Sequence, residues 1–136
     1  MVGMHASFIW DIPITRDSQP PYSEQEVRAL VESMKAAGLE VSVPVDAQYA
    51  WEFDCKLPHL SVYCQLGLIE DPQLNWLLSF YPWRGLVNWL WGRWWEDEQN
   101  WLVDVADGVL RKNSQISGLR WYTCDQWMKA GGRVEE

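Results

Sequence analysis

Histidine and cysteine are scarce in this chain, with two and three residues among 136. A small, odd number of cysteines excludes a disulfide scaffold and is typical of a reducing compartment, so we expect buried thiols and a cytoplasmic location. The first six residues contain neither a basic segment nor a long apolar stretch, so no secretory signal is expected. The most apolar run, 86–95, is about half as long as a membrane-spanning helix, and no membrane insertion is expected.

Sequence motifs for nucleotide binding and for serine hydrolases are missing. The chain has no G-x-G-x-x-G, G-x-x-x-x-G-K-[ST] or G-x-S-x-G string. Zinc is the one metal to consider, because Cys55, His59 and Cys64 could meet at a turn, with Cys124 as a fourth ligand. Their spacing lacks the closely paired ligands of structural zinc sites, and buried thiols beside a turn histidine are the preferred interpretation. We therefore expect no metal and no cofactor.

Positive charge is also in short supply. Eleven Lys and Arg against nineteen Asp and Glu give a formal net charge of −8 and an isoelectric point of about 4.7. Such a surface repels a phosphate backbone and attracts basic partners, so no nucleic-acid ligand is expected. Hydrophobic residues make up 48% and charged residues 22%, which is typical of a globular chain. The length predicts one domain over residues 1–136.

Hydrophobic periodicity predicts a fold of the α+β class. Helical spacing of apolar residues predicts helices over 23–37 and from 97 or 98 to 112, and a Ser23–Glu26 capping box and Gly38 would bound the first. Alternating apolar residues predict strands over 7–13, 39–45, 49–55, 60–68, 74–80 and 116–122, followed by a helical turn over 125–129. The order β-α-β-β-β-β-α-β predicts a two-layer sandwich with a mainly antiparallel sheet and the helices on one face.

The face of the predicted sheet that the helices leave uncovered should be polar and solvated. Tyr49 is in phase with the core of its strand, and the out-of-phase residues of the middle strands are Ala50, Glu52, Asp54, Ser61, Tyr63, Gln65, Asn75 and Ser79. Carboxylate pairs could act as general acid and base, and those considered are Glu52/Asp54, Glu70/Asp71, Glu96–Glu98 and Asp104/Asp107. Each pair has a structural explanation, because its residues fall in a turn, at a helix start or on a solvent-exposed face. No catalytic residue is therefore assigned, and enzymatic activity is the lowest ranked of the functions considered.

Tryptophan is the compositional outlier, with 11 residues. Six lie within 83–101, and most of these rings are expected to fill the interface between helix and sheet. The four tryptophans within 89–95 spread too widely around a helix for one buried stripe, so some should reach the surface. Exposed tryptophan next to the acidic run 96–98 favours an aromatic anchor with an acidic rim that faces a basic partner.

These features predict a small acidic protein-binding domain that inhibits a basic partner by occlusion. In size, charge and order of elements the chain is similar to the immunity proteins with which bacteria neutralise toxin domains, often basic nucleases, by covering the active site. The residues expected to bind the partner are Trp89, Trp91, Trp94, Trp95, Glu96, Asp97, Glu98, Glu52 and Asp54. The alternative is a domain that binds a carbohydrate or a small apolar ligand on stacked tryptophans, which requires a concave pocket. Self-association through the tryptophan surface stays open.

Overall fold

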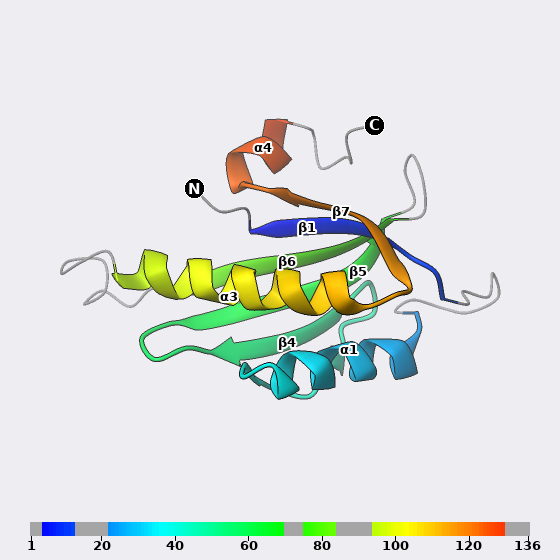
Figure 1. Cartoon of the computed structure of the whole chain (residues 1–136), viewed down its shortest axis with the longest axis horizontal. Helices are drawn as coiled ribbons and strands as arrows, with labels where there is room; N and C mark the ends of the chain where they lie inside the picture. The colour runs from blue at the N-terminus through cyan, green and yellow to red at the C-terminus, as the bar shows by residue number, and fades with distance from the viewer. Residues whose placement is uncertain (1–3, 13–21, 70–74, 84–93, 130–136) are drawn as a thin grey trace.

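The structure is a computed structural model that describes residues 4–12, 22–69, 75–83 and 94–129. It confirms the α+β class: a seven-stranded antiparallel sheet carries two long helices, α1 and α3, on one face (Figure 1). The elements in chain order are β1 (His5–Trp10), α1 (Glu24–Ala36), β2 (Glu40–Val41), β3 (Val45–Asp46), β4 (Trp51–Lys56), β5 (Ser61–Ile69), β6 (Asn75–Trp83), α3 (Trp94–Lys112), β7 (Ile116–Tyr122) and α4 (Cys124–Lys129).

The strands follow the order β2-β4-β5-β6-β1-β7, and β3 also pairs with β4. The predicted antiparallel meander is present as β4, β5 and β6. The N-terminal strand β1 lies between β6 and β7, where His5 is paired with both Ser79 and Tyr122. The N-terminal strand β1 is therefore an interior strand of the sheet, and the C-terminal strand β7 beside it is an edge strand.

The strand predicted over 39–45 is divided into β2 and β3, which pair with successive parts of β4. Two features between them explain the break. Pro44 has no N–H to donate to a strand ladder. The Ser42 hydroxyl accepts the Asp54 N–H at 2.8 Å, while the Ser42 N–H donates to the Asp54 carbonyl at 2.9 Å. A side chain therefore replaces one backbone acceptor, and the ladder is interrupted.

Helix α1 forms where the apolar spacing predicts it, and its buried residues are Val27, Leu30, Val31 and Met34. Gly38 follows its end with a φ of 106°, and the Leu39 N–H bonds to the Met34 carbonyl at 3.1 Å, as in glycine-terminated helices. The predicted capping box at Ser23 is wrong. Ser23 has a left-handed φ of 64° rather than the extended backbone of a side-chain cap, and its side chain makes no capping hydrogen bond.

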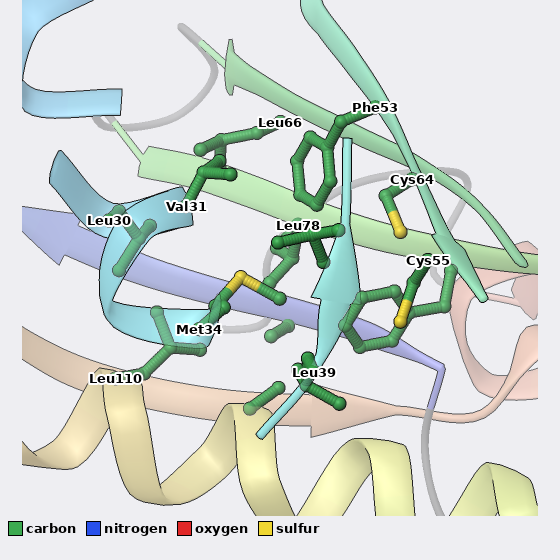
Figure 2. Packing of buried hydrophobic residues seen from close by; sticks show 14 of the residues in the cluster. Leu30, Val31, Met34, Leu39, Phe53, Cys55, Cys64, Leu66, Leu78 and Leu110 are labelled. Carbon is green, nitrogen blue, oxygen red and sulfur yellow. The ribbon is translucent and has the colours of Figure 1, made fainter. Parts of the chain in front are cut away.

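The core lies between the sheet and the two long helices. Figure 2 shows Leu30 and Met34 of α1 and Leu110 of α3 directed toward the sheet. Cys55 and Cys64, from the adjacent strands β4 and β5, point into the same core as free thiols, which confirms the expectation of buried cysteines for these two. Apolar burial of this kind is the main term that stabilises the fold.

Helix α3 begins at Trp94, upstream of the predicted start at Asp97 or Glu98. It buries Leu102, Val103, Ala106 and Leu110. Among the residues that the structure describes, no helix combines the length and apolar character that crossing a membrane requires.

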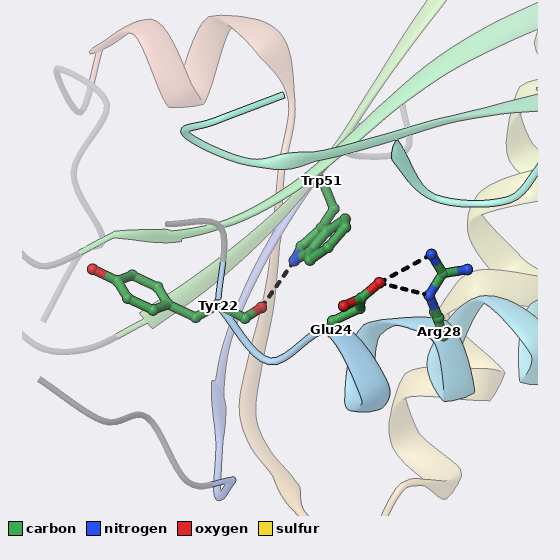
Figure 3. A network of polar contacts seen from close by, with 4 residues as sticks. All are labelled: Tyr22, Glu24, Arg28 and Trp51. Atoms are coloured by element: carbon green, nitrogen blue, oxygen red, sulfur yellow. Dashed lines mark hydrogen bonds and ion pairs between the residues drawn. The ribbon is translucent and has the colours of Figure 1, made fainter. Parts of the chain in front are cut away.

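A buried indole connects the segment before α1 to the sheet. The Trp51 Nε1–H of β4 donates to the Tyr22 carbonyl at 2.8 Å (Figure 3). In the first turns of the helix, Arg28 pairs with Glu24 at 3.1 Å across one turn. Because Tyr22 lies just before the helix start, the Trp51 bond positions α1 against β4.

Candidate functional site on the polar face of the sheet

The side of the sheet opposite α1 and α3, which we call the polar face, carries most of the polar side chains of the strands. Alternation along β4, β5, β6 and β1 brings them together, since residues of one face are paired across neighbouring strands. The expectation that this face is solvated holds for Asp54 and Ser61, which are exposed. It is wrong for Ala50, Asn75 and Ser79, which are buried by neighbouring side chains.

A carboxylate on β4 forms the centre of a polar network on this face. Glu52 Oε1 accepts hydrogen bonds from the Tyr63 hydroxyl and, at 3.3 Å, from the Tyr49 hydroxyl. The Gln65 side-chain amide donates to the oxygens of both phenols at 3.0 Å. Glu52 and Gln65 are directly paired across β4 and β5, so the strand register itself brings the members together.

Tyr49 enters this network through a turn that the periodicity did not reveal. The prediction that Tyr49 faces the core is wrong, because its side chain is 64% exposed. The reason is Gln48, whose φ of 74° bends the chain just before β4, so that Ala50 and Trp51 are both buried. The Asp46 carboxylate stabilises this bend by accepting the Gln48 N–H at 2.7 Å.

The environment of Tyr63 keeps its hydroxyl protonated. Partial burial and then the hydrogen bond to Glu52 raise the pKa of Tyr63 to about 12, because both disfavour a phenolate at this place. The hydroxyl therefore remains a donor to Glu52 throughout the physiological pH range. Glu52 is accordingly held by neutral donors.

Aromatic rings extend the site from β5 across β6 and β1. The ring centroids of Tyr63 and Tyr81 are 6.0 Å apart, and the Tyr81 and His5 rings pack edge to face with their centroids 5.7 Å apart. Trp127 of α4 stacks on His5 at 5.9 Å and also contacts Tyr122. Unlike α1 and α3, the short helix α4 therefore places a ring on the polar face.

A histidine–serine pair lies beneath these rings. His5 Nδ1 and Ser79 Oγ are 2.8 Å apart, and burial lowers the pKa of His5. Such a pair has the distance of a base and a nucleophile. However, His5 is 3% and Ser79 is 1% exposed, so a substrate could not reach the hydroxyl. The pair is therefore interpreted as structural.

The structure separates the predicted partner-binding residues into two groups. Glu52 and Asp54 lie on the polar face, with Asp54 exposed. Glu96 and Asp97 are exposed in the first turn of α3, which covers the other face. Glu98 is 13% exposed in its side chain, and its Oε1 accepts the backbone N–H of the turn residue His59 at 2.8 Å.

The predicted tryptophan anchors fall largely outside the described parts of the chain. This holds for Trp89 and Trp91 as whole residues and for the side chains of Trp94 and Trp95. The side chain of Trp101, from the same cluster, is described and is 46% exposed on α3.

Metal coordination finds no support in the described ranges, where no three His, Cys, Asp or Glu residues are grouped closely enough to hold an ion. Cys55 and Cys64 lie in the core, whereas His59 is exposed at a turn and contacts Glu98. Burial raises the pKa of both thiols, to about 11 for Cys55, where the Glu40 charge adds to the effect. Both therefore remain protonated at neutral pH.

The cavities between described elements include three with volumes of about 360, 280 and 240 Å³. The largest is between α1 and α3, the second is beside β7 and α4, and the third is between α1 and the segment 41–44. Trp121, at the second, is the single tryptophan that lines any of the three. Because the side chains of Trp89, Trp91, Trp94 and Trp95 lie outside the described parts of the chain, the alternative of a concave platform of stacked tryptophans stays a prediction.

No family model, no curated protein and no solved structure matches this chain. The polar face is therefore the feature on which a function can be argued. The alternation of the strands predicts Glu52, Asp54, Tyr63 and Gln65 on this face, whereas Tyr81 lies on it without having been predicted. Extending the same alternation beyond residue 80 would have found it, because β6 continues to Trp83.

Proposed function

We propose that this chain is a protein-binding domain that inhibits a basic protein by covering its active surface, in the manner of bacterial immunity proteins. The observation that carries the proposal is the grouping of Glu52 and Asp54 with Tyr49, Tyr63 and Tyr81 on the polar face. Tyrosine is enriched at protein interfaces, because its ring supplies contact area and its hydroxyl tolerates water.

Charge supports a basic partner. The chain has a formal net charge of −8, and Asp46, Glu52 and Asp54 lie on or beside the polar face. Complementary charge accelerates encounter and disfavours acidic competitors. A basic toxin domain in the bacterial cytoplasm is the partner that this proposal favours.

The start of α3 is proposed as a second region that contacts the partner. Glu96 and Asp97 are exposed there, and Trp89, Trp91, Trp94 and Trp95 are proposed as neighbouring aromatic anchors. Because the polar face and α3 lie on opposite sides of the sheet, each is proposed as a separate contact region. Alanine substitution within each region separates their contributions.

The test is retention of a binding partner from native lysate at low and moderate salt, followed by mass spectrometry and an activity assay of the purified partner. We expect one basic protein, inhibited at an equimolar ratio. Its association rate should fall by about tenfold or more between low and high salt.

A matched pair of variants distinguishes the polar face from general charge. Glu52→Gln with Asp54→Asn removes two negative charges from the polar face, and Glu32→Gln with Asp104→Asn removes two exposed charges from the helices. The first pair should weaken inhibition and the second should not. Salt-insensitive association, equal effects of the two pairs, or no retained partner would each contradict the proposal.

A further inference from the structure

Within the described parts of the chain, the hydrogen-bond directions around Glu52 leave one of its oxygens without a donor. Gln65 gives its amide hydrogens to the Tyr49 and Tyr63 oxygens, so each phenol directs its own hydrogen to Glu52 Oε1. Among the residues that the structure describes, no group donates a hydrogen bond to Oε2. Three neutral side chains thus orient a carboxylate whose second oxygen is available.

No Lys, Arg or His side chain of the described ranges forms an ion pair with this carboxylate, although Lys56 lies four residues along the same face of β4. The arginines and histidine that form ion pairs there contact Glu24, Glu98 and Asp107. Asp54, two residues along the same face of β4, adds a second negative charge nearby. The position therefore favours a cation from outside the chain.

Exposed aromatic rings lie around the same carboxylate. Tyr49 is 64% and Tyr81 is 43% exposed, and Tyr63 lies between Glu52, to which it is bonded, and the Tyr81 ring at 6.0 Å. A cation over the face of such a ring is attracted by its quadrupole. A guanidinium fits this combination better than an ammonium, because it is planar, stacks on rings and donates from its edge to a carboxylate.

We infer that Glu52, Tyr49, Tyr63 and Tyr81 form a binding site for one guanidinium group, supplied by an arginine side chain of the basic partner. The source of the arginine rests on the proposed function. The binding of a guanidinium at this site does not rest on the proposed function, because the carboxylate and the tyrosine rings that bind it belong to this chain. Glu52 accepts hydrogen bonds from the N–H groups at the edge of the guanidinium, and the tyrosine rings stack on the plane of the guanidinium.

The test is a titration of the whole chain with Nα-acetyl-arginine amide, followed by NMR on the side-chain amide of Gln65, which bonds to both phenols. We expect a saturable shift with a dissociation constant in the millimolar range, typical of a single side chain. The uncharged citrulline analogue should cause no such shift, and the lysine analogue should bind several-fold more weakly.

Three variants establish which groups carry the binding. Glu52→Gln should weaken it at least tenfold, Tyr63→Phe should weaken it several-fold, and Glu32→Gln, on α1, should leave it unchanged. Unshifted amide signals in the other strands show that each variant is folded. Tyr63→Phe retains the ring and thus tests the hydroxyl that holds the carboxylate.

The inference is overturned by a non-saturable response, by equal binding of the citrulline or lysine analogue, or by equal binding to Glu52→Gln. Its failure is distinguishable from failure of the proposed function. If arginine amide binds but no basic protein is retained from lysate, the site stands and the inhibitory function falls. If a basic partner is retained and inhibited while arginine amide does not bind, the reverse holds.

Discussion

The indole N–H of Trp121 donates a hydrogen bond to the Asp107 carboxylate at 2.9 Å, which joins the edge strand β7 to helix α3. Asp107 also pairs with Arg111 at 2.9 Å, and the Trp121 ring stacks on Phe80 at 6.2 Å. In the sequence, Asp104 and Asp107 form one of the carboxylate pairs that could act as general acid and base. The contacts of Asp107 instead make it a link between two elements.

Removing the Asp107 acceptor should destabilise the fold. We expect Asp107→Ala to lower the free energy of unfolding by about 1–2 kcal/mol, because the half-buried indole loses its partner. Asp107→Asn retains an amide oxygen and should cost less. Denaturant unfolding measures both, and Asp104→Ala, at an exposed position of the same helix, is the control. Equal losses for the three variants would refute the link.

Tyr63 should ionise only at strongly alkaline pH. Its folded pKa of about 12 lies above the unfolded value of about 10, so its contribution to stability is complete below pH 10 and is lost as the pH rises toward 12. Absorbance at the tyrosinate band should lose the component that titrates at about 12 in Tyr63→Phe. In Glu52→Gln this component should move to lower pH. An unchanged titration of Glu52→Gln would mean that the hydrogen bond does not hold the proton.

Acid should weaken the fold partly through His5. Burial lowers the folded pKa of His5, so the unfolded chain binds its proton first and stability decreases as the pH falls below about 6.5. We expect His5→Gln to reduce this slope when unfolding is measured between neutral and mildly acidic pH. A His5→Gln slope equal to that of the unchanged chain would contradict the prediction.

The thiols of Cys55 and Cys64 should be unreactive in the folded protein. Both are buried with raised pKa, so neither thiolate nor access is available to a disulfide reagent. With Cys124 replaced by Ser, modification should occur at the rate of unfolding and become rapid in denaturant. Rapid labelling without denaturant would show that this part of the core opens.

Local patterns predicted part of the candidate site. Glu52, Asp54, Tyr63 and Gln65 were assigned to one face, because the period of two along a strand is a local property. Tyr49 was assigned to the wrong side, since a single positive φ at Gln48 ends the alternation. No residue type in the sequence requires that bend.

Tyr81 was missed because Pro82 looked like the end of a strand. The Phe80 N–H points toward β1 and bonds to the Met4 carbonyl. An N–H at position 82 would point to the same side, but beyond the start of β1 at His5. Proline, which lacks this N–H, is therefore tolerated at position 82. No ladder bond is lost at Pro82, and β6 continues along β5. That Pro82 does not end β6 is thus decided by where β1 begins, and β1 is distant in the chain.

The sequence by itself determined the class of the fold, the two long helices, the meander and the acidic charge, because burial of one side of an element is encoded in the spacing of its own residues. The tertiary structure alone decided that β1 lies between β6 and β7, that α4 places Trp127 on His5, and that two phenols, themselves held by the Gln65 amide, converge on Glu52. These relationships join residues on different elements, and their free energy depends on distances that only the assembled sheet sets.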